Sequence, residues 1–114
     1  MSKVRKCQVL VIGAGPGGYV AAIRSAQLGL NTIIVEGERA GGVCLNVGCI
    51  PSKAIIHAAE RYEALSKHSS EEGHMGISVS GNPEIEMKGV VEWKDGIVQR
   101  LTKAVETLIK NAGA

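Results

Sequence analysis

Aromatic side chains are almost missing from this chain of 114 residues, which has no phenylalanine, two tyrosines and one tryptophan. Its apolar residues are instead small or β-branched. Such residues suit the close packing of helices on a sheet better than an aromatic-lined sandwich core. A chain of this length forms one small domain at most, with room for a single hydrophobic core.

Strong net charge and long apolar runs are also absent. The formal charge is +2 and no basic stripe is visible, which argues against a nucleic-acid surface. The apolar stretch Val9–Ile12 breaks at a glycine-rich turn after a few residues, too soon for a signal peptide or a membrane span. We therefore expect no nucleic-acid or membrane partner. The expected location is the cytoplasm, or the mitochondrial matrix for a processed eukaryotic form.

Cysteine is scarce, and its odd count argues against a structural disulfide framework; the three residues are Cys7, Cys44 and Cys49. A close pair with one distant thiol indicates metal or redox chemistry. Metal is the weaker alternative, because no second ligand pair at zinc-site spacing is found among the histidines, His57, His68 and His74. We expect Cys7 to be an inert buried thiol and His57 to be a packing residue.

The first third of the chain predicts a strand–helix–strand unit. A β-branched run at 8–12 is followed by a small-residue helix at 18–28, which Gly29 ends, and by a second β-branched run at 32–35. Such a unit predicts two parallel, buried strands joined by a right-handed crossover. The fold class is therefore α/β.

The rest of the chain predicts a loop at 36–48, a helix at about 52–65 that has Pro51 in its first turn, and a polar surface stretch at 66–94. A short strand is possible at Ile77–Val79. An amphipathic helix is expected over 95–112, with Asp95 as N-cap and Gly113 after its end. Its apolar face contains Ile97, Val98, Leu101, Val105, Leu108 and Ile109.

The glycine-rich turn fits the dinucleotide-binding pattern G-x-G-x-x-G between a strand and a helix. Gly13 permits the tight turn, Gly15 lets a pyrophosphate approach the backbone, and Gly18 lets the helix pack on the strand. The helix N-terminus offers free N–H groups to the phosphate. Glu36 follows the second strand, where a carboxylate can accept hydrogen bonds from an adenosine ribose. The pattern alone does not separate FAD from NAD, and a plain glycine-rich turn beside a solvated glutamate remains the alternative.

Cys44 and Cys49 are five residues apart. On a regular helix, five steps turn the side chain by about 140° and advance it by about 7.5 Å, which exceeds what a disulfide tolerates. If the two bridge, residues 45–48 must depart from helix, and Gly48 can adopt an unusual conformation. A helix that starts near Cys49 would stabilise its thiolate. Spacing alone leaves two free neighbouring thiols as the alternative.

The stretch GGVCLNVGCIPSK at 41–53 resembles the active-site segment of the flavin-dependent disulfide reductases. Its Leu-Asn-Val-Gly spacer, its Ile-Pro-Ser-Lys tail and the later Val-Val-Glu-Trp-Lys at 90–94 are most similar to the dihydrolipoamide dehydrogenase family. The resemblance implies a partial Rossmann-like FAD-binding domain over 1–114, with a short parallel sheet and flanking helices. It also implies that NAD and interface domains are absent, so we expect a fragment that is inactive in turnover by itself and prone to self-association.

The same resemblance implies site roles. Cys44 and Cys49 form the redox-active disulfide, with Cys44 exchanging with substrate and Cys49 beside the flavin. The cofactor-binding residues are Gly13, Gly15, Gly18, Glu36 and Lys53. The family usually has threonine where this chain has Val43, so we expect weaker FAD binding.

The implied reaction oxidises dihydrolipoamide to lipoamide through the disulfide and FAD, with NAD as acceptor. The implied partners are lipoyl domains of 2-oxoacid dehydrogenase complexes and a second subunit of a homodimer. Two alternatives remain open: another flavin disulfide reductase of the glutathione or mercuric type, and a non-catalytic nucleotide-binding module with a cysteine redox switch.

Overall fold

The computed structural model describes residues 4–69 and 75–114. Within them the chain forms, in order, β1 (Val9–Ile12), α1 (Pro16–Gln27), β2 (Thr32–Val35), α2 (Gly42–Asn46), α3 (Cys49–His68) and α4 (Met87–Ala112). The two strands pair in parallel, from Val9 opposite Thr32 to Ile12 opposite Val35. The predicted α/β class and parallel pairing are confirmed.

The two-stranded sheet is covered on one face only. Helix α1 packs against both strands, and its Ala22 is fully buried. On the opposite face Leu10, Ile12 and Val35 are exposed, with Ile12 81% accessible. The expectation of buried strands was therefore wrong, because the described residues supply no second layer for that face. Apolar strand residues indicate that a face is suited to burial, but they do not supply the second layer that would bury it.

Helix α2 lies within the segment that was predicted to be a loop. Five residues form just over one helical turn, and Leu45 points from it into the core. A helix this short is not stable by propensity in water, so tertiary contacts must hold it. The loop prediction failed because a short, glycine-flanked helix has no recognisable periodicity.

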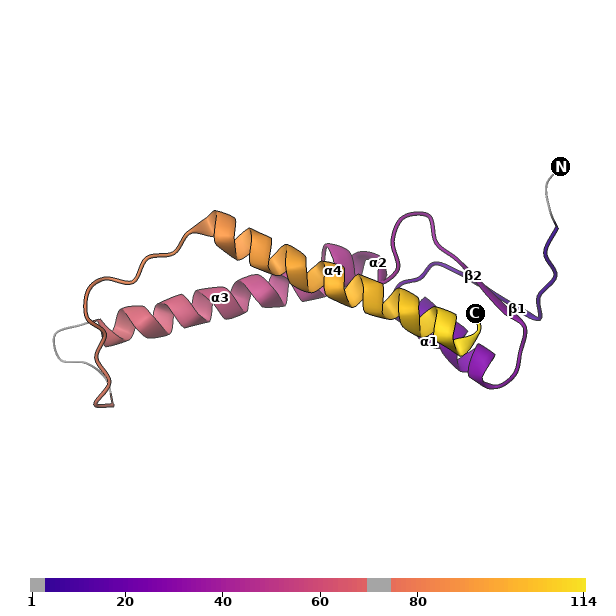
Figure 1. Ribbon diagram of the computed structural model, residues 1–114, viewed down its shortest axis with the longest axis horizontal. Coiled ribbons are helices and arrows are strands. Elements are labelled where there is room, and N and C mark those ends of the chain that lie inside the picture. Colours follow the sequence, from indigo (N-terminus) through magenta and orange to yellow (C-terminus); the bar gives the residue numbers. More distant parts are fainter. Residues whose placement is uncertain (1–3, 70–74) are drawn as a thin grey trace.

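Helix α3 contacts the N-terminal part of α4, which runs in the opposite direction, and the two splay apart away from the sheet (Figure 1). Both are longer than predicted. Helix α4 begins at Met87, and its N-cap is Glu86, whose carboxylate accepts from the backbone N–H groups of Lys88 and Gly89. The prediction of Asp95 as N-cap was wrong, because contact with α3 carries the helix through Gly89 and Gly96. The predicted end at Gly113 is confirmed by its left-handed conformation.

The core lies where α4 crosses α1 and α2. It is built from small and β-branched side chains with one leucine: Ala14, Ala40, Leu45, Val98, Val105 and Ile109. Half of the predicted apolar face of α4 is thus buried. Leu101 and Leu108 are exposed and Ile97 is half-buried. The buried stripe is narrow because α4 contacts the other helices along one side only.

The molecule is elongated, measuring 70 × 30 × 17 Å, with the α3–α4 pair projecting away from the sheet (Figure 1). Its radius of gyration is 21.1 Å, whereas a compact domain of this length has about 13 Å. The accessible surface is 8411 Å² for 11.9 kDa, against about 6,000 Å² for a compact monomer of that mass. The excess surface includes many exposed large apolar side chains.

The predicted strand at Ile77–Val79 does not form: Ile77 makes an isolated bridge, and the Val79 N–H donates to the His68 carbonyl. His74 lies outside the described residues.

Among the described residues, the run Gly42–His68 is long and apolar enough to cross a membrane by length and composition alone. This corrects the expectation that no stretch reaches such a length. It is weak evidence for a membrane segment, because a core helix of a soluble protein passes the same test. The run is also interrupted, since α2 ends at Asn46 and α3 begins at Cys49.

Candidate functional site

The glycine-rich turn connects the carboxyl end of β1 to the N-terminus of α1. Gly15 is the N-cap and Pro16 opens the helix; the first helical hydrogen bond runs from the Tyr19 N–H to the Gly15 carbonyl at 2.9 Å. The N–H groups of Gly17 and Gly18 therefore have no partner inside the helix and point out of its N-terminus. That is the geometry in which a helix binds a phosphate.

Gly18 has no room for a side chain. A Cβ there would lie 1.9 Å from the carbonyl oxygen of Gly13, which a real atom cannot do. Gly13 itself has a φ of +95°, as the tight turn requires. Gly15 is different, because open space surrounds the position of its missing Cβ. The tight turn predicted at Gly13 and the close packing predicted at Gly18 agree with this geometry, and Gly15 leaves its backbone open to approach.

Glu36 is hydrogen-bonded to the glycine-rich turn. Its Oε2 accepts from the Ala14 N–H at 2.6 Å, and its Oε1 accepts from the Glu38 N–H at 3.0 Å. These backbone donors hold the pKa of the Glu36 carboxyl below its ordinary value. Each oxygen keeps a lone pair free for a further donor such as a ribose hydroxyl. The bond to Ala14, which sequence reasoning missed, follows from the parallel strands placing both segments at one edge.

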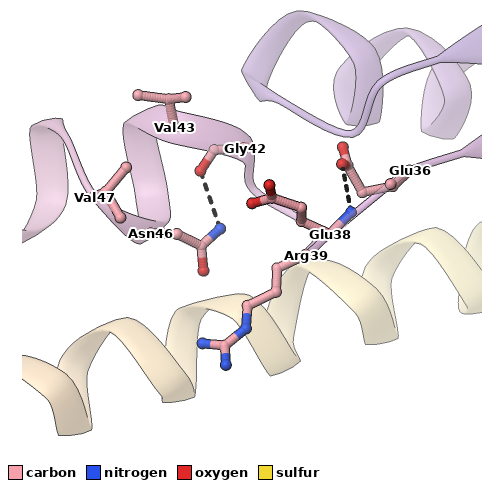
Figure 2. Close-up of a pocket in the computed structure, with 8 residues that line it drawn as sticks. Glu36, Glu38, Arg39, Gly42, Val43, Asn46 and Val47 are labelled. Carbon is pink, nitrogen blue, oxygen red and sulfur yellow. Dashed lines mark hydrogen bonds between the residues drawn. The ribbon is translucent and has the colours of Figure 1, made fainter.

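A cavity of about 630 Å³ opens beside Glu36 (Figure 2). One wall is the segment after β2 and the other is α2; the lining residues are Glu36, Gly37, Glu38, Arg39, Gly42, Val43, Asn46 and Val47. Val43 and Val47 are 74% and 75% exposed at its edge. The cavity therefore joins the end of the second strand to the helix that contains Cys44.

The start of α2 packs directly on the glycine-rich turn. The Gly41 N–H donates to the Ala14 carbonyl at 2.7 Å. A Cβ on Gly42 would lie 2.7 Å from the Cα of Gly15, so only glycine fits between the two backbones. The cysteine helix and the candidate phosphate site are therefore held together by main-chain contacts.

Cys44 and Cys49 lie on either side of a break between α2 and α3. The departure from regular helix that a bridged pair would need over residues 45–48 is found at Val47–Gly48, whereas Leu45 and Asn46 belong to α2. Glycine is favoured at position 48 by close approach, since a Cβ would lie 3.0 Å from the Val43 carbonyl oxygen. Both cysteines are thiols in this structure; Cys44 is half-buried and Cys49, the first residue of α3, is exposed.

The two sulfurs are close enough to interact. The hydrogen bond to Cys49 raises the pKa of the Cys44 thiol, and burial raises it further. The positive charge of Lys53, one helical turn beyond Cys49, acts in the opposite direction on the pKa of Cys44. The net effect places the pKa of the Cys44 thiol above its ordinary value. Lys53 is exposed, and its charge acts on Cys44.

Cys7 and His57 are not among the residues that line the cavity beside Glu36. Cys7 is half-buried two residues before β1, and not fully buried as predicted. His57 stacks on Trp93 of α4 with ring centroids 6.2 Å apart, which confirms its predicted packing role. Within residues 4–69 and 75–114, no cluster of three or more metal-ligating side chains is found.

Asn46 is a site residue that sequence reasoning missed. Its Nδ2 donates to the carbonyls of Ala40 and Gly42, both at 3.0 Å, and its Oδ1 accepts from the Thr102 hydroxyl at 3.1 Å. Figure 2 shows the amide nitrogen turned toward Gly42 and the oxygen facing the α4 ribbon. The only sequence signal was an asparagine between the two cysteines, and its partner is 56 residues away.

Comparison with known proteins gives a consistent family. Residues 7–113 match the family model described as pyridine nucleotide-disulphide oxidoreductase. Dihydrolipoyl dehydrogenase of Pseudomonas aeruginosa is 54% identical over 113 residues, which cover 99% of this chain and 24% of that protein. The enzyme of the same name from Geobacillus stearothermophilus is 58% identical over 103 residues, covering 90% of this chain and 21% of the relative. The chain thus spans about a quarter or less of these curated relatives.

A solved structure has the same fold over most of the chain. It is a copper(II) complex of the HOCl-induced flavoprotein disulfide reductase RclA from Escherichia coli, with a TM-score of 0.70 and 21% identity over 93% of this chain and 20% of that one. At this identity the likeness establishes the fold alone, a partial Rossmann-like arrangement. The family is shown by the match of the family model over nearly the whole sequence: this chain belongs to the pyridine nucleotide-disulphide oxidoreductases.

Proposed function

We propose that this chain supplies the FAD-binding and redox-disulfide portion of a dihydrolipoyl dehydrogenase. The complete enzyme would oxidise dihydrolipoamide to lipoamide and reduce NAD. The identity of 54% to the enzyme from P. aeruginosa over 99% of this chain supports that choice over glutathione or mercuric reductases.

One observation carries the proposal: α2 begins against the nucleotide turn. The Gly41–Ala14 hydrogen bond and the Gly42–Gly15 contact put a reactive cysteine one turn of helix from a candidate phosphate site. A nucleotide-binding module with an unrelated pair of cysteines has no need of that packing. An enzyme that moves electrons between a thiol pair and a bound dinucleotide does.

The residues present fit a dinucleotide cofactor. Open space at Gly15 permits close approach of a pyrophosphate to the backbone, and the first N–H groups of α1 would bind it. Glu36 would accept from the adenosine ribose, and Lys53 would lie on the flavin side. When bound, the flavin would accept the electron pair of the reduced cysteines and deliver it to NAD.

The cysteines would perform thiol–disulfide exchange. In the oxidised pair, a substrate thiolate attacks the Cys44 sulfur, a mixed disulfide forms, and Cys49 leaves as a thiolate. The second substrate thiolate then displaces Cys44, which releases the substrate disulfide and leaves both cysteines reduced. Lys53 and the N-terminus of α3 would stabilise the Cys49 thiolate electrostatically. Substrate gives up two electrons and two protons in all.

The partners follow from that reaction. The substrate would be dihydrolipoamide on the lipoyl domains of 2-oxoacid dehydrogenase complexes, and the complete enzyme would be a cytoplasmic or mitochondrial-matrix homodimer. The isolated chain would not turn over, because it offers no second G-x-G-x-x-G turn for NAD.

The first test is a visible absorption spectrum of the purified chain after FAD is added and free cofactor is removed. Retained flavin bands support the proposal. If the chain stays colourless but retains NAD, the nucleotide-binding module with a redox switch is the better account.

A second test separates the two cysteines. With an oxidised lipoyl disulfide as probe, Cys49→Ser should form a stable mixed disulfide at Cys44, whereas Cys44→Ser should form less. Because Cys49 is the more exposed thiol in this chain, trapping at Cys49 instead would reverse the two roles.

A further inference from the structure

The amide of Asn46 connects three separate parts of the chain. It joins Ala40 in the segment after β2, Gly42 at the start of α2, and Thr102 in the middle of α4. Three of the four hydrogen bonds available to an asparagine amide are thereby made. Such a set fixes position far better than any single bond.

The contact with Thr102 is specific. A threonine inside a helix commonly donates its hydroxyl to the carbonyl four residues earlier, and Thr107 of α4 does so, to Lys103 at 2.8 Å. The Thr102 hydroxyl instead crosses to Asn46 Oδ1 at 3.1 Å. It lies on the buried stripe of α4, between Val98 and Val105.

The position of Cys44 depends on this network. Helix α2 is five residues long and ends at Asn46, and the break at Val47–Gly48 separates it from α3, which holds Cys49. Main-chain contacts hold the start of α2 on the glycine-rich turn, and α2 also contacts α3. The burial of Leu45 and the Asn46 bonds are the contacts that tie the end of α2, and with it Cys44, to α4 and the segment after β2. A helix of about one turn is not stable without tertiary contacts.

We infer that Asn46 and Thr102 are positioning residues for the cysteine pair: through this bridge, α4 sets how readily Cys44 and Cys49 form their disulfide. The inference rests on the redox role proposed above. The equilibrium constant for disulfide formation measures how closely the chain holds its two thiols, so loosening α2 lowers it. Loss of one hydrogen bond from a half-buried amide predicts a decrease of about five-fold.

The test equilibrates the 114-residue chain with reduced and oxidised glutathione. Cys44 and Cys49 lose two electrons and two protons and form one disulfide, while one oxidised glutathione becomes two reduced molecules. The fraction oxidised is read by alkylation and mass spectrometry, which counts Cys7 separately. Thr102→Val should lower the constant about five-fold, and Thr102→Ser, which keeps the hydroxyl, should restore it.

Thr107→Val is the matched control. It removes the same hydroxyl from the same helix at a position bonded only within α4, so the constant should not change. A merely structural role for Thr102 would lower the thermal stability of Thr102→Val and leave its redox constant alone. If Thr102→Val does not fold, Asn46→Asp replaces it: its carboxylate still accepts from Thr102 but cannot donate to Ala40 or Gly42, so the constant should also fall.

The outcomes separate the two proposals. Equal constants for the native chain, Thr102→Val and Asn46→Asp, with the native disulfide formed, would overturn the positioning role alone. A native chain that forms no Cys44–Cys49 disulfide at any glutathione ratio would overturn the redox role and the positioning role with it.

Discussion

At the scale of single residues, the site depends on positions where the backbone leaves no room for a Cβ atom. Gly17 and Gly18 are adjacent glycines at the start of α1, but their surroundings differ. Nothing lies within 4 Å of a Cβ built on Gly17, whereas one on Gly18 meets the Gly13 carbonyl oxygen.

Gly18→Ala is therefore expected to displace α1 from β1. It should lower the free energy of unfolding by about 1–3 kcal/mol and abolish FAD retention. Gly17→Ala is the matched control and should leave both nearly unchanged. Urea denaturation and the visible spectrum measure the two effects; equal behaviour of the two alanine variants would contradict a packing role for Gly18.

Val43 lies on the cavity-facing edge of α2, at the position where the family resemblance implies a threonine. Val43→Thr should tighten FAD binding about ten-fold, because a hydrogen bond to a charged phosphate contributes about 1.5–3 kcal/mol. Val47→Thr is the control, since Val47 lines the same cavity and is equally exposed. Titration with FAD, followed by fluorescence, checks this. An unchanged affinity in Val43→Thr would contradict a contribution of a hydroxyl at this position to FAD binding.

Glu36 and Glu63 both have a lowered pKa, for different reasons. Backbone N–H groups lower the pKa of Glu36. The pKa of Glu63 is lowered by Lys67, which lies 2.7 Å away on the exposed side of α3. Salt screens exposed ion pairs but not fixed backbone hydrogen bonds. Carboxyl NMR titration should therefore show the pKa of Glu63 rising toward its ordinary value in 1 M salt while the pKa of Glu36 stays low.

The sign of the pH dependence follows from the lowered pKa of Glu36. A group whose pKa is depressed by folding stabilises the fold above its unfolded value, and this contribution is lost as the pH falls through the folded value. The Glu36–Ala14 link is thus present at neutral pH and weakens in acid. In Glu36→Gln this acid-dependent part of the stability should disappear; an unchanged pH profile would refute it.

At the scale of elements, α4 determines whether the other parts hold together. It contacts α1, α2 and α3, and its buried stripe supplies half of the core cluster. Ile109→Ala should destabilise the chain by about 2–4 kcal/mol, because Ile109 is only 8% exposed. Leu108→Ala, one position away and 56% exposed, should cost about 0.5 kcal/mol or less. Similar losses in both would show that α4 packs on a different face.

At the scale of the whole molecule, the exposed apolar face of the sheet predicts self-association. Within residues 4–69 and 75–114 the outer edges of β1 and β2 have no strand partner, and Leu10, Ile12 and Val35 face solvent. Analytical ultracentrifugation should show a mass that rises with concentration. Ile12→Lys should reduce this, while Val4→Lys, at an exposed residue outside the strand, should not. A single monomeric mass at all concentrations would contradict the prediction.

The sequence alone determined the local part of the fold and the chemistry. The strand–helix–strand unit follows from the periodicity of its residues. The packing role of Gly18 follows from its spacing in the glycine-rich turn. Both depend on residues that are close to one another along the chain. The cysteine segment was identified by its resemblance to a family, since spacing left free thiols as an alternative.

Only the tertiary structure determined the long-range contacts. Helix α2, the start of α4 at Met87, and the bridge from Asn46 to Thr102 each depend on partners far away in the sequence. The expectation of buried strands failed for the same reason. Periodicity shows which face of an element is apolar, but which other element covers that face is decided by packing between distant segments.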